Sequence, residues 1–202
     1  MHRALRLAEI ESEEGVNSTF FILLRCEFYS IFEKAIKERV HKILSLGNEV
    51  ALHFDITYYP EHTLKKNLKN HLEYEASVLE NEFGTEIKSF SFHNTTELTK
   101  KFTDPTYGRL LNTGSDFFMD KYSYCSDSNG YWKFKRLNDV LERDDIQYLQ
   151  VLTHPVWWVK SPMLPRERVL RAAEGRTKDV MKAYDLLLDN HGKVNVGKKS
   201  KD

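Results

Sequence analysis

The stretch EVALHFD, residues 49–55, decides the fold of this chain. Three of its apolar side chains alternate with smaller or polar ones, which is typical of a short buried strand. Side chains two positions apart on a strand point to the same face, so His53 and Asp55 are expected to project together at the strand's end. Imidazole and carboxylate groups are common ligands of catalytic zinc. The alternative is a core histidine that is bonded to its neighbouring aspartate.

Segments with strand and helix patterns alternate along the chain around this stretch. Runs rich in β-branched and aromatic residues predict strands, and apolar residues at helical spacing predict helices. Such alternation implies parallel strands with right-handed crossovers, so we predict an α/β sheet or a (β/α) barrel. The expected helices cover residues 3–14, 29–46, 60–83, 137–141 and 165–188, with a short one near 96–102. The expected strands cover 16–24, 50–54, 87–92, 117–119, 122–125 and 146–153.

Length and composition predict one domain over residues 1–190, followed by a disordered tail over 191–202. The chain has 202 residues, and its 41% apolar content can supply a sizeable core. Lys+Arg and Asp+Glu both number 30, which argues against a nucleic-acid or membrane-surface partner. No run is long and apolar enough to span a membrane, and the start has no export-signal pattern, so a cytoplasmic location is expected. The oligomeric state stays open.

Histidines end three of the predicted strands. These are His53, His93 and His154, and Asp127 stands near the end of a fourth candidate. Ligands and catalytic groups of parallel α/β folds lie beyond the carboxyl ends of the strands. One such histidine alone is more simply a loop or core residue, but three at equivalent positions predict a shared cleft.

Five motifs carry a resemblance to a known family. They are ExExxxGVNSTFF from residue 9, LGNEVALHFD from 46, SFSFHN from 89, YxSDSNGYW from 124 and VLTHPVWW from 151. Together they resemble the polysaccharide deacetylase (NodB-homology) superfamily, and among its members a divergent branch found with surface-polysaccharide genes. The resemblance covers residues 5–158. It implies a distorted or incomplete (β/α) barrel that hydrolyses N-acetyl groups on a sugar with the help of a divalent metal, zinc being the expected ion.

The resemblance also implies roles for individual residues. His53 matches the first metal histidine, with Asp55 or His93 as the expected second ligand. His154 matches the late acid, which protonates the leaving amine. Asp127 and Trp132 resemble the pair that supports this histidine and lines the acetyl pocket. The expected carbohydrate-binding residues are His93, Trp132 and Trp157.

Two departures from the family pattern leave an alternative open. Thr57 occupies the position of the usual second metal histidine, and a hydroxyl is a poor substitute for imidazole on zinc. The family's opening strand, with its paired aspartates, is not seen before Arg3. We therefore expect weak metal binding or none from this chain, with hydrolysis only if such a strand is supplied. The alternative is a truncated, inactive homologue that binds a carbohydrate or a partner, with Trp132, Trp157 and Trp158 as stacking surfaces.

Overall fold

The computed structural model describes residues 1–132 and 135–197. The chain divides into two compact units, residues 1–159 and 160–202. The single domain over 1–190 and the disordered tail over 191–202 therefore stay predictions, and residues 198–202 lie outside the described part. In the described ranges, no helix combines the length and the apolar character that crossing a bilayer would require.

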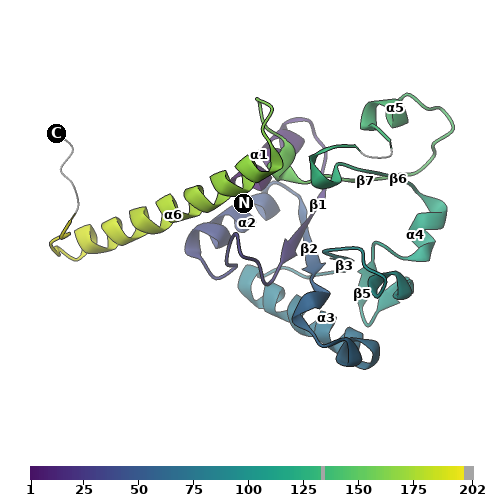
Figure 1. Cartoon of the computed structure of the whole chain (residues 1–202), viewed down its shortest axis with the longest axis horizontal. Coiled ribbons are helices and arrows are strands. Elements are labelled where there is room, and N and C mark those ends of the chain that lie inside the picture. Colours follow the sequence, from purple (N-terminus) through teal and green to yellow (C-terminus); the bar gives the residue numbers. More distant parts are fainter. Residues whose placement is uncertain (133–134, 198–202) are drawn as a thin grey trace. The chain divides into compact units, whose positions relative to one another are not determined.

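A largely parallel sheet forms the centre of the first unit (Figure 1). Its strand order is β1-β2-β3-β5-β4, and every pair is parallel except β4 with β5. The register sets Leu23 opposite His53 and His53 opposite Ser91, so the carboxyl ends of neighbouring strands lie together. The strands are β1 (Thr19–Leu23), β2 (Glu49–Phe54), β3 (Ser89–Phe92), β4 (Thr106–Tyr107) and β5 (Leu110–Asn112).

Helices α2 and α3 pack against this sheet and against each other. Their apolar stripes meet β2, whose Val50, Leu52 and Phe54 are buried, and the intervening Ala51 is buried as well. A strand buried on both faces explains why the pattern of residues 49–55 is so strongly apolar. The long helices of the first unit are α1 (His2–Glu13), α2 (Lys34–Ser45) and α3 (Glu61–Phe83), and α6 (Pro165–Asn190) belongs to the second unit.

Two further strands form a separate parallel sheet within the first unit. They are β6 (Ser123–Ser126) and β7 (Leu149–Leu152), joined through α5 (Leu137–Leu141). The strand orders of the two sheets do not close on each other anywhere in residues 1–132 and 135–197. The predicted α/β class with an incomplete barrel is therefore confirmed. Four single 3-10 turns complete the described elements: η1 (Ile56–Tyr58), η2 (Thr99–Lys101), η3 (Ser128–Gly130) and η4 (Pro155–Trp157).

Three local predictions are wrong in ways that have physical causes. Residues 117–119 are not a strand but part of helix α4 (Asp116–Lys121), where Asp116 and Lys121 complement the helix dipole. Phe118 stacks on Tyr122 one turn later, with ring centroids 5.3 Å apart, a pair that helical spacing favours. Residues 29–33 are not helical, and residues 106–112, expected as loop, form the β4–β5 hairpin.

Tyr29 shows what holds the non-helical segment before α2. Its hydroxyl accepts a hydrogen bond of 3.0 Å from the backbone N–H of Leu23, the last residue of β1. Burial raises the pKa of the Tyr29 phenol, so the ring stays neutral at the sheet edge. The tertiary contact therefore overrides the helical periodicity of residues 29–33.

Candidate functional site

The rings of His53 and His93 lie together at the carboxyl ends of β2 and β3. Their centroids are 5.0 Å apart, and the ring planes are nearly perpendicular at 89°. The Nδ1 atom of His53 shares a 2.8 Å hydrogen bond with the hydroxyl of Ser91, its neighbour across the sheet. The backbone N–H of His93 donates to the carbonyl of Phe54 at 2.9 Å, which prolongs the β2–β3 pairing to the site.

The electrostatic surroundings of His53 favour its neutral form. Its pKa is lowered to about 4, chiefly by burial and next by the charge on His93. The charge on His154 lowers it further, whereas the Ser91 hydrogen bond and the charge of Asp55 oppose the shift. His53 and His93 are thus in contact at the ends of neighbouring strands. The convergence of all three strand-end histidines, with His154 among them, stays a prediction.

A buried carboxylate holds His154 in place. Asp127 is 3% exposed, and its Oδ1 atom lies 2.7 Å from Nδ1 of His154. The backbone N–H of His154 donates to both oxygens of the same carboxylate, at 3.0 and 3.1 Å. The two residues are neighbours because β6 and β7 pair in register, Ser126 opposite Leu152. With Nδ1 held by Asp127, Nε2 is the ring nitrogen of His154 that is left for a ligand.

Trp158 is a second side chain that bonds the Asp127 carboxylate. Its indole Nε1–H donates to Oδ2 of Asp127 at 3.0 Å. The sequence analysis did not predict this contact. The signal in the sequence was the spacing of His154 and Trp158 around the η4 turn. Sequence reasoning assigned Trp158 only a stacking surface.

Trp157 packs on the turn that follows Asp127. A Cβ atom added to Gly130 would lie 3.0 Å from Cε3 of Trp157, and Gly130 has a φ of +84°. A side chain on residue 130 would therefore strain the backbone and displace the indole. Trp132, just beyond η3, is half-buried. Their predicted sugar-binding roles stay predictions.

The carboxylate of Asp55 is hydrogen-bonded to a neighbouring residue of its own loop. Its Oδ1 atom accepts 2.9 and 2.7 Å hydrogen bonds from the backbone N–H and the hydroxyl of Thr57, and so caps η1. His53 meanwhile commits Nδ1 to Ser91. In residues 1–132 and 135–197, no three His, Cys, Asp or Glu side chains are grouped so that they could hold a metal ion. The donor set at His53 and Asp55 therefore does not fit the expected divalent metal.

A second polar cluster lies beyond the ends of β1 and β2, and sequence reasoning missed it. Arg25 donates to the hydroxyl of Tyr59 at 3.0 Å and forms an ion pair with Glu75, which is 2% exposed. Tyr59 donates to the same carboxylate at 2.7 Å. Burial raises the pKa of Glu75, and burial together with the Glu75 bond raises the pKa of Tyr59 to about 12.

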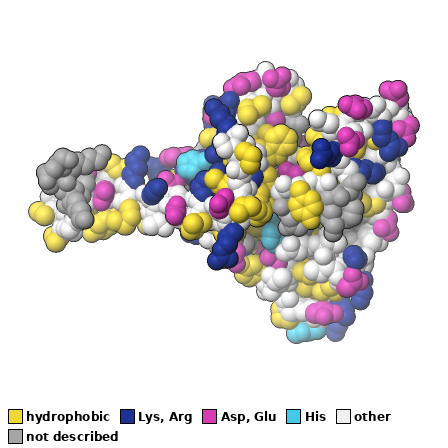
Figure 2. All heavy atoms as spheres, turned by 45° about the horizontal axis from the view of Figure 1, so that its top comes forward, with side chains coloured by type: hydrophobic (Ala, Val, Ile, Leu, Met, Phe, Trp, Pro, Cys, Tyr) yellow, Lys and Arg dark blue, Asp and Glu magenta, His cyan; other side chains and the backbone are white. Residues whose placement is uncertain are grey.

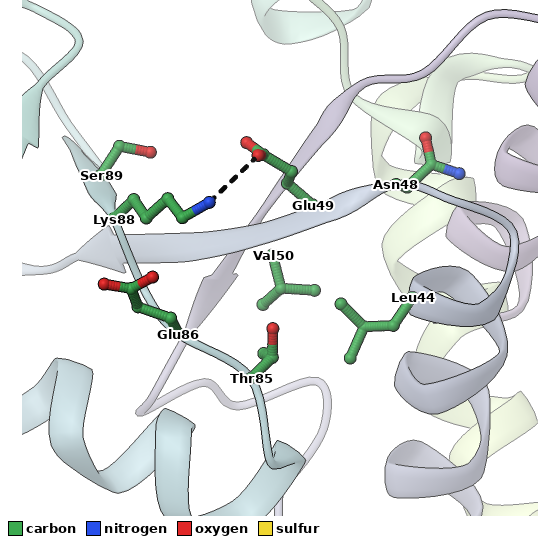
Figure 3. Close-up of a pocket in the computed structure, with 8 residues that line it drawn as sticks. All are labelled: Leu44, Asn48, Glu49, Val50, Thr85, Glu86, Lys88 and Ser89. Atoms are coloured by element: carbon green, nitrogen blue, oxygen red, sulfur yellow. Dashed lines mark ion pairs between the residues drawn. The ribbon is translucent and has the colours of Figure 1, made fainter.

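A small cavity of about 130 Å³ lies at the other end of the strands, near the amino ends of β2 and β3 (Figure 3). Its lining comes from the amino ends of β2 and β3, where Lys88 and Glu49 form a 3.9 Å ion pair. It is thus separate from the His53–His93 pair, which lies at the carboxyl ends of the same strands. On the face shown in Figure 2, acidic and basic side chains are interspersed, in line with a net charge of zero.

Comparison with known proteins gives matches among solved structures only. No family model and no curated protein matches the chain. Among the solved structures to which the chain is similar, two are described as CE4 proteins and one as a polysaccharide deacetylase. They include the Xyl-CE4 domain of a multidomain xylanase from the hindgut metagenome of Trinervitermes trinervoides, with 15% identity, a TM-score of 0.49, and coverage of 100% of this chain and 90% of that one.

Two Bacillus proteins are also similar. A CE4 family pseudoenzyme from Bacillus anthracis has 17% identity and a TM-score of 0.46, over 76% of this chain and 50% of that one. A polysaccharide deacetylase from Bacillus cereus has 11% identity and a TM-score of 0.43, over 87% and 82%.

Proposed function

We propose that this chain is a polysaccharide deacetylase-like protein whose histidine cleft binds an N-acetylated sugar. The observation that supports this best is the buried Asp127 carboxylate, which holds Nδ1 of His154 at 2.7 Å. An Asp–His pair with one free ring nitrogen is suited to donate or accept a proton at a bound substrate. The five sequence motifs supply the substrate class, an N-acetylated sugar of a surface polysaccharide.

In the hydrolytic form of this proposal, His154 is the proton donor. Water adds its oxygen to the acetyl carbon and gives one proton to His154 Nε2, the C–N bond breaks, and the leaving nitrogen takes that proton from Nε2, so that the products are acetic acid and the free amine. Asp127 stabilises the imidazolium that exists before this transfer, because its negative charge is buried within hydrogen-bond distance. His53 stays neutral near pH 7 and is therefore suited to hydrogen bonding with the substrate rather than to carrying charge. Since the donors at His53 and Asp55 do not fit a metal, no step is assigned to one.

A second candidate function is sugar binding without turnover. The hydrogen bonds that Asp55 makes to Thr57 favour it, because they remove a carboxylate from the set that would otherwise activate water. Tyr58 and Trp158, 44% and 48% exposed, offer aromatic surface on which a sugar ring can stack. Both candidates share the binding of an N-acetylated sugar.

Binding and hydrolysis can be measured separately with oligomers of N-acetylglucosamine. Calorimetry gives affinity, and an enzymatic acetate assay gives turnover. We expect His154→Gln to weaken binding about tenfold or more, because it removes the ligand-facing nitrogen. His62→Gln, on the exposed side of α3, is the matched control and should change neither the affinity nor the turnover.

Binding without acetate release would favour the second candidate. Absence of both across a panel of N-acetylated oligosaccharides would overturn the proposal.

A further inference from the structure

The carboxylate of Asp127 is held by His154 and Trp158. Oδ1 accepts from the backbone N–H of His154 and lies 2.7 Å from its Nδ1. Oδ2 accepts from the same backbone N–H and from the indole of Trp158. An amide N–H and an indole N–H can only donate, so the carboxylate is the acceptor in these three bonds. Its remaining contact, with Nδ1 of His154, is a hydrogen bond from the imidazole when that nitrogen carries the hydrogen.

Trp158 is the one side chain other than His154 that bonds this carboxylate in the described ranges. The segment that carries it is well fixed. The 3-10 turn η4 closes it through a 2.9 Å bond from Trp157 N–H to the His154 carbonyl, and η4 contacts helix α1. The indole is nevertheless 48% exposed, so burial of its ring alone does not explain its orientation. The hydrogen bond to Asp127 does.

We propose that Trp158 is a positioning residue that orients Asp127 and thereby fixes the tautomer of His154, with hydrogen on Nδ1 and a free Nε2. The role of this tautomer in the reaction rests on the proposed function, since Nε2 is the nitrogen that would exchange a proton with the sugar. The geometry stands without that function. Loss of the indole donor leaves Oδ2 with only the backbone N–H of His154, so the carboxylate can rotate and the Nε2–H tautomer becomes populated.

Nitrogen-15 spectra of labelled histidine measure the tautomer directly, because the two ring nitrogens shift in opposite directions when the hydrogen moves. We expect His154 in the unaltered chain to be mainly the Nδ1–H form at neutral pH. In Trp158→Phe the ratio of the Nδ1–H to the Nε2–H form should fall about threefold or more, as expected for loss of one hydrogen bond to a charged group. Trp157→Phe, one residue earlier, removes an indole but leaves the His154 and Trp158 donors to Asp127 in place, so the ratio should stay unchanged.

A second measurement covers the case in which Trp158→Phe does not fold. In the unaltered chain the Trp158 indole proton should resonate downfield and exchange slowly with water, and Asp127→Asn should reverse both properties. A folded Trp158→Phe with the original tautomer ratio, or an indole proton that exchanges rapidly, would overturn the inference. Sugar affinity is measured on the same samples. A tautomer change without any sugar binding overturns the proposed function alone, and sugar binding without the tautomer change overturns this inference alone.

Discussion

His53 and His93 meet edge to face at the ends of β2 and β3, with ring centroids 5.0 Å apart. Burial, and next the charge on His93, lower the pKa of His53 to about 4. His53 is therefore a neutral, hydrogen-bonding group at pH 7. Because the folded protein disfavours the charged form of His53, its free energy of unfolding depends on pH in the acid range.

We expect the free energy of unfolding to fall as the pH drops from about 6.5 to about 4. His53 has a lower pKa in the folded state than in the unfolded state, so the unfolded chain takes up the proton first. The loss from this group is at most about 3 kcal/mol across that range. Urea unfolding at a series of pH values measures it. His53→Gln should flatten the curve, and His62→Gln should not; equal curves for all three chains would contradict the assignment.

Breaking the Arg25–Glu75 pair from one side should be costly. Arg25→Leu leaves the buried Glu75 carboxylate without its ion-pair partner, and we expect the free energy of unfolding to fall by about 2–3 kcal/mol. The double variant Arg25→Leu with Glu75→Leu should recover most of this loss, because no buried charge remains. A double-mutant cycle by urea unfolding gives the coupling energy. Strictly additive effects of the two single changes would show that the pair does not interact in solution.

Gly130 and Gly175 give a matched pair of glycine-to-alanine changes. Gly130→Ala should lower the free energy of unfolding by about 1–3 kcal/mol, since residue 130 has a φ of +84° and the new methyl would press on Trp157. Gly175→Ala should raise it by about 0.5–1 kcal/mol, because the residue lies within helix α6 and no atom lies within 4 Å of the added Cβ. Thermal and urea unfolding measure both. The same sign for the two changes would be inconsistent with this geometry.

Zinc should have little effect on this chain. Among the described residues no three His, Cys, Asp or Glu side chains are grouped to hold an ion, so zinc meets no ready-made ligand group there. We expect the melting temperature to stay constant when zinc or a chelator is added at micromolar concentrations, since a ligand raises it only by binding the native state. Stoichiometric zinc binding by calorimetry that disappears in His53→Gln would prove the opposite.

Much of the fold could be predicted from the sequence because it depends on local periodicity. The apolar alternation of residues 49–55 predicted β2, and the leucine stripe of residues 60–83 predicted α3 almost to its ends. The Phe117–Met119 stretch was misassigned, because aromatic side chains favour strands as residue types yet also stack across one helical turn. The contact between His53 and His93 follows from their positions at the ends of neighbouring parallel strands. That inference needs only the rule that parallel strands end at one edge.

The sequence by itself determined the longer helices and the central strands, and that three histidines stand at or just beyond strand ends. Only the tertiary structure decided their partners. Trp158 donates a hydrogen bond to Asp127, 31 positions away. Arg25 forms an ion pair with Glu75, and Asp55 accepts a hydrogen bond from Thr57. The physical reason is that hydrogen bonds and ion pairs depend on atoms brought within about 3 Å by strand register and loop packing. Residue spacing fixes which face a side chain takes, but not the atom it meets there.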